Sequence, residues 1–153
     1  MAVMTRWLDS DEQRTWRAFL TASRALMDTL DRELQRDAGM PHAYYEILVR
    51  LSEAPDRRLR MSDLAEAAGS SRSRLSHAVA RLEAAGWVRR EEHPTDRRGQ
   101  IASLTDAGFA ALAAAAPGHV EGVRRHLFDA LSPAQVDQLR RISETLTEHL
   151  TGS

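Results

Sequence analysis

Hydrophobic residues recur every three or four positions along most of the chain, a spacing typical of amphipathic helices. The first such stretch spans residues 10–38, where Ser10 and Gln13 have the spacing of a capping box. A second stretch runs from Pro41 to Ala54, where the proline that follows disfavours helical backbone. The first third of the chain is therefore predicted to form two helices.

In the middle of the chain the residue pattern predicts two short helices and then a pair of strands. A short helix is predicted with Ser62 as its N-cap, followed by a turn at Gly69–Ser71 and a helix from about Ser71 to Ala85. Short strand-like segments on either side of a Pro94–Gly99 turn then predict a β-hairpin. Two helices joined by a glycine-containing turn and followed by a hairpin have the order of a winged helix-turn-helix. We therefore predict a mainly α fold with a small β-hairpin wing.

Two further helices are predicted over residues 106–151. Thr105 caps the first, which we expect to kink or break at Pro117, and Ser132 with Gln135 begins the second as a capping box. The long terminal helices carry apolar stripes that a small winged-helix head cannot cover. Pairing with a second copy would cover them, and intramolecular three-helix packing is the alternative. We expect one domain, residues 1–153, with dimerisation helices at 10–38 and 106–151 and a winged helix-turn-helix at 41–105.

Composition excludes several classes of protein. Cysteine is absent, which rules out disulfide scaffolds, thiolate metal sites and thiol chemistry. No apolar run is long enough to span a membrane, and the start lacks a signal pattern, so we expect a cytoplasmic protein. All 21 basic residues are arginine, and residues 57–98 hold ten of them against six acidic residues, a net of +4 in a chain of net charge -1. A basic middle indicates contact with a polyanion, although chance clustering gives the same counts.

The fourth predicted helix has two distinct faces. At 100° per residue, Leu75, Val79 and Leu82 fall on one side, whereas Ser73 and His77 point the opposite way. A short polar face near a helix start suits entry into the major groove of DNA, where such side chains bind base edges or phosphates. An amphipathic helix with a solvated polar face gives the same wheel. The order of helix, turn, helix and hairpin favours the DNA-reading interpretation.

The turn of the predicted hairpin carries the second signal. Arg97 and Arg98 lie on a tight turn beside Asp96. A guanidinium at such a tip can enter the minor groove of DNA, and a neighbouring carboxylate can position it through paired hydrogen bonds. A solvated charged turn is the alternative.

Five segments carry a family resemblance: Leu59-Arg60-Met61-Ser62-Asp63-Leu64-Ala65, Ser70-Ser71-Arg72-Ser73-Arg74-Leu75-Ser76-His77, Arg81-Leu82-Glu83-Ala84-Ala85-Gly86-Trp87-Val88, Pro94-Thr95-Asp96-Arg97-Arg98-Gly99 and Leu104-Thr105-Asp106-Ala107-Gly108. With them the chain resembles the MarR family of bacterial winged-helix transcription regulators. The resemblance implies that residues 71–77 enter the major groove and that Arg98, positioned by Asp96, enters the minor groove. It also implies a homodimer and a small-molecule pocket, often for aromatic acids.

The predicted site residues form two sets. Those expected to bind DNA are Arg60, Ser70, Ser71, Arg72, Ser73, Arg74, His77, Arg81, Asp96, Arg97 and Arg98. Those expected to line a ligand pocket are Trp16, Arg17, His42, Tyr44 and Tyr45, because an aromatic wall with a cation suits a planar anion. Trp16 and Tyr45 also fall on core stripes, so packing is the alternative role for both.

We therefore expect a homodimeric regulator that binds a palindromic operator in double-stranded DNA. The expected form is a repressor whose operator affinity falls when a small aromatic or anionic ligand binds. A winged-helix protein-interaction module that does not bind DNA is the alternative. We expect no catalytic residues, cofactor or metal, although a zinc site at His119, Glu121 and His126 stays open as a lesser alternative.

Overall fold

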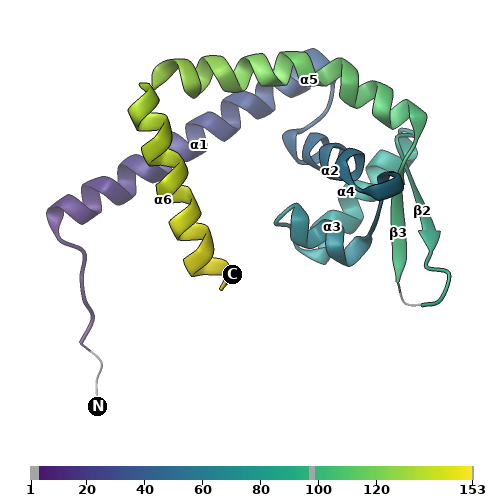
Figure 1. Cartoon of the computed structure of the whole chain (residues 1–153), viewed down its shortest axis with the longest axis horizontal. Helices are drawn as coiled ribbons and strands as arrows, with labels where there is room; N and C mark the ends of the chain where they lie inside the picture. The colour runs from purple at the N-terminus through teal and green to yellow at the C-terminus, as the bar shows by residue number, and fades with distance from the viewer. Residues whose placement is uncertain (1–3, 97–98, 153) are drawn as a thin grey trace. The chain divides into compact units, whose positions relative to one another are not determined.

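The computed structural model describes residues 4–96 and 99–152, which divide into two compact units (Figure 1). The terminal unit lies within Met1–Leu30 and Val123–Ser153. The second unit, Asp31–Gly122, is called the head below. Helices α1 (Ser10–Ala38) and α5 (Asp106–His126) each contribute to both units.

The head combines three short helices with a small sheet. Its elements in chain order are α2 (His42–Glu53), β1 (Arg58–Arg60), α3 (Met61–Ala67), α4 (Arg72–Ala84), β2 (Val88–Glu92) and β3 (Gln100–Leu104). The three helices contact one another, α2 and α3 also contact β3, and α4 contacts β2. Figure 1 shows these helices grouped beside the strands. Their shared core is aliphatic and includes Leu48, Leu51, Leu64, Leu75, Val79 and Leu82.

The predicted hairpin is part of a three-stranded antiparallel sheet of order β1-β3-β2. β2 pairs with β3 from Val88 opposite Leu104 to Glu92 opposite Gln100, as the hairpin prediction requires. The third strand, β1, was not predicted; it pairs with β3 through Leu59 opposite Ala102. A strand of three residues is too short for a period of two to show in a sequence, so pairing with β3 defines it. The β2–β3 hairpin is therefore extended by a third strand that precedes α3.

The helix-turn-helix forms where the sequence predicts it. Gly69 takes the left-handed backbone that the turn requires, at φ 60°. The Ser71 hydroxyl accepts a hydrogen bond from the Arg74 backbone N–H at 3.2 Å and caps α4. The predicted N-cap of α3 is wrong, because Ser62 lies inside a helix that begins at Met61, and the position before it makes no side-chain cap.

The predicted capping box of α1 is wrong by one residue. The box is formed by Asp9 and Glu12, which exchange backbone-to-carboxylate hydrogen bonds of 2.8 and 3.0 Å.

Of the kink or break expected at Pro117, the break does not occur, because residues Asp106–His126 form one continuous helix. A proline removes one helical hydrogen bond, and the alanine-rich sequence before it favours helix strongly enough to continue.

The last helix, α6 (Pro133–Thr151), begins as predicted. The Ser132 hydroxyl accepts from the Gln135 backbone N–H at 3.2 Å, and the Gln135 side chain accepts from the Ser132 N–H at 2.9 Å. Within the part of the chain that the structure describes, none of the helices combines the length and hydropathy that crossing a bilayer requires.

Candidate nucleic-acid interface

Packing fixes which face of α4 meets solvent. Leu75, Val79 and Leu82 are buried in the head core, whereas Ser73 and His77 are exposed. The predicted wheel is therefore confirmed. The short polar side chains near the start of α4 are exposed, and none of the described residues of the head buries them.

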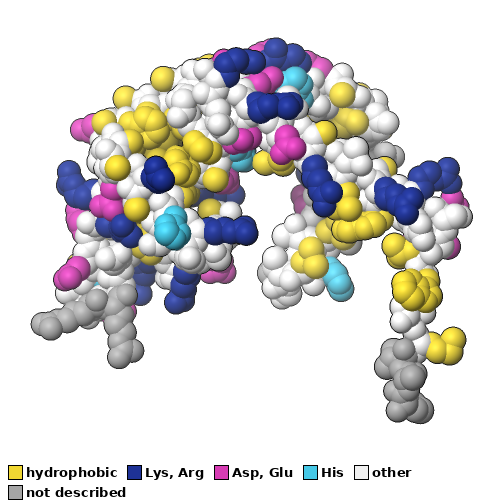
Figure 2. Space-filling model, turned by 180° about the vertical axis from the view of Figure 1, so that it is seen from behind, with side chains coloured by type: hydrophobic (Ala, Val, Ile, Leu, Met, Phe, Trp, Pro, Cys, Tyr) yellow, Lys and Arg dark blue, Asp and Glu magenta, His cyan; other side chains and the backbone are white. Residues whose placement is uncertain are grey.

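Three arginines on this helix form no ion pair with the other described residues. Within residues 4–96 and 99–152, no acidic side chain forms a salt bridge with Arg72, Arg74 or Arg81, and all three are exposed. Other arginines of the head form ion pairs: Arg36–Asp37, Arg50–Glu46, Arg57–Asp106, Arg58–Glu91, Arg89–Glu91 and Arg90–Glu83. Figure 2 shows several dark blue arginine side chains on the surface of the head. The positive charge on α4 is therefore available to an external anion.

One of the internal pairs holds the wing against α4. The Arg90 Nε donates to Glu83 Oε1 at 2.8 Å, and Arg90 Nη1 donates to the Ser76 hydroxyl at 3.3 Å. The Arg90 backbone N–H also reaches Glu83 Oε2, at 3.4 Å. These bonds join β2 to the middle of α4, so the strand and the helix are positioned together. The sequence reasoning missed this contact, since residues on separate elements gave no local signal.

Hydrogen bonds close the turn of the wing around His93. The His93 backbone N–H donates to the Gly99 carbonyl at 2.9 Å, and the Gly99 N–H donates to the Asp96 carbonyl at 3.1 Å. The imidazole Nδ1 lies 3.2 Å from the backbone nitrogens of both Thr95 and Asp96. His93 was not among the predicted residues, although its position before Pro-Thr-Asp could have suggested a turn-closing side chain. Arg97 and Arg98 lie outside the described residues.

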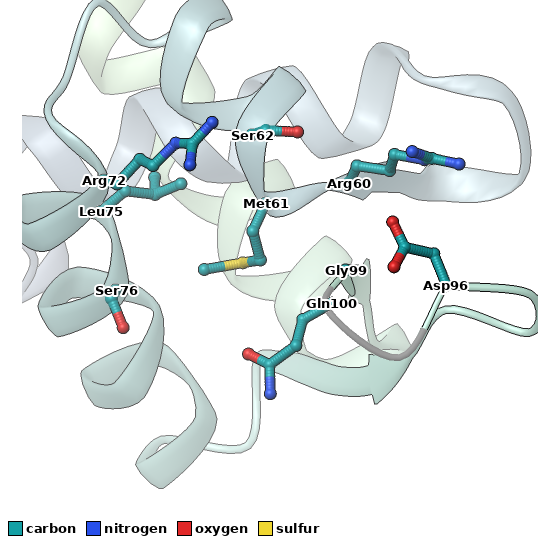
Figure 3. Close-up of a pocket in the computed structure, with 9 residues that line it drawn as sticks. All are labelled: Arg60, Met61, Ser62, Arg72, Leu75, Ser76, Asp96, Gly99 and Gln100. Carbon is teal, nitrogen blue, oxygen red and sulfur yellow. The ribbon is translucent and has the colours of Figure 1, made fainter.

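A cleft of about 370 Å³ lies between the start of α3, α4 and the wing (Figure 3). It is lined by Arg60, Met61, Ser62, Arg72, Leu75, Ser76, Asp96, Gly99 and Gln100. In Figure 3, Arg60 and Asp96 lie on one side of this cleft, with Arg72 and Ser76 on the other. The cleft thus brings together three residues that the sequence analysis expected to bind DNA: Arg60 from β1, Arg72 from α4 and Asp96 from the wing turn.

The predicted ligand residues fall in different units. Trp16 and Arg17 are exposed on the part of α1 that belongs to the terminal unit, whereas His42, Tyr44 and Tyr45 belong to the head. Tyr45 is 6% exposed and belongs to the core, which agrees with the alternative that it serves packing. Trp16, by contrast, is half exposed.

A histidine that was not assigned to the ligand set completes an aromatic cluster in the head. The His119 ring centroid lies 4.4 Å from that of Tyr45 and 5.4 Å from that of His42. Burial, and to a lesser degree His42, lowers the pKa of His119, and burial raises the pKa of Tyr45. The buried His119 Nδ1 has no hydrogen-bond partner among residues 4–96 and 99–152. Among the described residues, no three histidine, aspartate or glutamate side chains form a metal-holding group.

Fold and site together define a winged helix-turn-helix protein, and comparison with known proteins gives its family. The MarR family profile matches residues 38–99. Sco3205 of Streptomyces coelicolor, a MarR family transcriptional regulator solved in complex with DNA, is 56% identical, with a TM-score of 0.92 over 95% of this chain and 92% of that one. AbsC of the same organism, also a MarR family regulator, is 46% identical, with a TM-score of 0.90 over 97% and 100%. The chain belongs to the MarR family of transcriptional regulators, which are not enzymes.

A more distant relative carries a named activity. The transcriptional repressor MprA of Escherichia coli is 30% identical over 112 residues, which make up 73% of this chain and 63% of MprA. The chain therefore matches less than two thirds of the length of that repressor.

Proposed function

We propose that the protein is a homodimeric regulator that binds a palindromic site in double-stranded DNA and represses transcription. The observation that carries the proposal is the outward face of α4, where Arg72, Arg74 and Arg81 have no ion pair among the described residues. A solvated surface helix usually pairs such charges with acidic neighbours, whereas a groove-binding helix leaves them for phosphates and guanine edges. The DNA complex of Sco3205 and the repressor MprA support the same conclusion.

The α4 side chains divide into two roles. Ser73 and His77 project from the centre of the polar face and read base edges, and the flanking arginines Arg74 and Arg81 bind phosphates or guanines. The neighbouring phosphates of the DNA backbone are contacted by Ser70, Ser71, Arg72 and Arg60. At the wing, Asp96 positions Arg98 for the minor groove, with Arg97 beside it, as predicted from the sequence.

The terminal unit supplies the dimer interface. None of the α6 residues is buried, although Leu139, Ile142, Leu146 and Leu150 lie on one face of it. The segment before α1 adds Met4 and Trp7, the latter 85% exposed, and Figure 2 shows hydrophobic side chains beside the grey N-terminal residues. Apolar surface of this kind is stabilised when a second copy covers it. A two-fold dimer places two α4 helices about one DNA turn apart, roughly 34 Å.

The regulatory part of the proposal follows the sequence prediction. Residues 1–153 act as one functional unit in the cytoplasm, with the winged helix-turn-helix over 41–105 flanked by dimerisation helices. A small aromatic or anionic effector lowers operator affinity by changing the spacing of the two heads. Within the head, His42 and Tyr44 are its proposed contacts.

Selection from a random-sequence DNA pool tests the proposal. The full-length protein should enrich two inverted half-sites separated by about one helical turn. Ser73→Ala and His77→Ala should change the enriched sequence more than the affinity for unselected DNA, because base contacts specify and phosphate contacts position. The matched control is Ala80→Ser, further along the same exposed face. No enrichment, or one unchanged by both variants, would contradict the proposed reading face and favour the protein-interaction module.

A further inference from the structure

The Arg90 guanidinium joins the wing strand β2 to two residues of α4. Its Nε donates to Glu83 Oε1 at 2.8 Å, and its Nη1 donates to the Ser76 hydroxyl at 3.3 Å, across 14 positions of sequence. The Arg90 and Glu83 side chains are 24% and 34% exposed, so solvent screens this ion pair less than a fully exposed one. A guanidinium is planar and rigid, so the bond to Glu83 determines where Nη1 points. Glu83 therefore holds Arg90 in place beside Ser76.

The hydroxyl of Ser76 is bonded differently from the helical hydroxyls of α6. There, Thr145 and Thr147 donate to the backbone carbonyls four residues earlier, both at 2.9 Å. Ser76 instead accepts from Arg90, because a guanidinium can only donate. A hydroxyl carries a single hydrogen, and none of the described residues accepts that of Ser76. This hydrogen, polarised by the charge on Arg90, is therefore available to an acceptor outside the chain.

Ser76 is exposed and lines the cleft between α4 and the wing (Figure 3). Arg72 lies on the same side of the cleft, whereas Arg60 and Asp96 lie on the other. In the proposed complex α4 occupies the major groove and the wing turn the minor groove. Adjacent grooves of a duplex are separated by one sugar–phosphate strand, so that strand crosses the cleft. The acceptors that reach Ser76 are then phosphate oxygens, and the charge of Arg72 favours them.

We propose that the Ser76 hydroxyl donates to a phosphate oxygen of the DNA strand that crosses the cleft, and that Arg90, held by Glu83, is the positioning residue for this contact. The inference rests on the proposed function. It adds Ser76 to the DNA-binding residues and gives Arg90 and Glu83 a role in binding without contact to DNA. Arg90 belongs to β2, so the hydroxyl is oriented only while the wing strand lies against α4. The phosphate contact thus links the position of the wing to that of the reading helix.

Removing the hydroxyl tests the phosphate contact. Ser76→Ala should weaken binding to the selected DNA about tenfold per subunit, the size expected for loss of a hydrogen bond to a charged group. The slope of log affinity against log salt should not change, because an uncharged side chain releases no counterion. Ser76→Thr keeps the hydroxyl and should restore most of the affinity. The matched control is Ser103→Ala, since the Ser103 hydroxyl donates within the sheet, to the Arg89 carbonyl at 3.4 Å.

A methylphosphonate scan of the selected DNA identifies the phosphate. Each substitution replaces one charged phosphate oxygen by a methyl group. For the wild-type protein, substitution at the phosphate that crosses the cleft should weaken binding, and the loss at that position should be smaller for Ser76→Ala, because groups in contact are energetically coupled. Losses that are the same for both proteins at every position would overturn the contact.

The role of Arg90 is tested in two backgrounds. Arg90→Lys keeps a positive charge for Glu83 but offers a single nitrogen in place of Nε and Nη1. It should weaken DNA binding in the wild-type background and cause no further loss in Ser76→Ala, because it acts through that hydroxyl. A purely structural role of Arg90 would cost the same affinity in both backgrounds, so additive losses would overturn the positioning role.

Three outcomes separate this inference from the proposed function. If the wild-type protein binds its selected DNA and Ser76→Ala binds as tightly as Ser103→Ala, the phosphate contact is refuted while the proposed function stands. If Ser76→Ala changes the enriched sequence, Ser76 contacts a base edge and the phosphate assignment is wrong. If the wild-type protein does not bind DNA, both fail.

Discussion

Replacing Ile142 by aspartate should dissociate the dimer. Ile142 is 58% exposed, and Leu139, Leu146 and Leu150 on the same face of α6 are 38%, 43% and 78% exposed. Together they expose the equivalent of about two whole aliphatic side chains, and burying each is worth about 1.5–3 kcal/mol. A symmetric pair buries this face twice, which gives roughly 6–12 kcal/mol before the cost of association.

Ile142→Asp removes the contribution of Ile142 to this burial free energy in each copy. At 58% exposure that contribution is about 1–2 kcal/mol per copy, or about 2–4 kcal/mol for the dimer, to which the cost of desolvating a carboxylate is added. The dissociation constant should therefore rise at least thirtyfold. Sedimentation equilibrium over a range of protein concentrations measures this constant directly.

The matched control is Thr151→Asp, which adds the same charge at an exposed position nine residues after Ile142, on the opposite side of α6. It should leave the dissociation constant within about threefold of the wild-type value. An Ile142→Asp protein that dimerises as tightly as Thr151→Asp would refute the assignment of this face. A wild-type chain that is monomeric at every concentration would refute the dimer itself.

Three further predictions concern the head. Gly108→Ala should lower the free energy of unfolding by more than about 2 kcal/mol, because an added Cβ would lie 2.1 Å from the Trp87 carbonyl oxygen. Urea denaturation measures this loss. An unchanged free energy of unfolding would show that α5 is free to shift. Because burial, chiefly, lowers the pKa of His119 below 6.5 in the folded state, the unfolded chain binds more protons and stability falls as the pH drops below 6.5. His119→Gln should flatten that part of the stability profile, and an unchanged profile would contradict the shift. Arg74→Ala should weaken DNA binding and reduce the slope of log affinity against log salt. Arg89→Ala should have a much smaller effect, because Arg89 pairs with Glu91. Equal effects would show that ion pairing within the protein does not distinguish the arginines that bind DNA from those that do not.

Local signals account for the parts of the fold that the sequence predicts well. The turn at Gly69, the cap at Ser71 and the capping box at Ser132 depend on residues within a few positions of one another. The alternation of faces on α4 depends on helical period alone, and the burial of Leu75, Val79 and Leu82 confirms it. These features need no knowledge of distant contacts.

The failures arise where distant residues decide. Strand β1 exists because it pairs with β3, more than 40 positions away in sequence, and its three residues have no pattern of their own. Arg90 becomes a candidate through its contacts with Glu83 and Ser76, and His119 through its packing on Tyr45. The error at the start of α1 was different: Asp9 and Glu12 offered a capping box one residue before the predicted one, so the local pattern was ambiguous.

The central claim is that Arg72, Arg74 and Arg81 of α4 bind DNA, and the salt dependence of binding tests it most directly. The full-length protein is titrated onto fragments of its own upstream region and onto random DNA at several salt concentrations. Six contacts from Arg72, Arg74 and Arg81 of two subunits predict that log affinity falls with log salt at a slope of about -5 or steeper, with retention of a specific fragment well above random DNA. Absence of retention at low salt, both on the upstream fragments and on a random-sequence pool, would contradict the account.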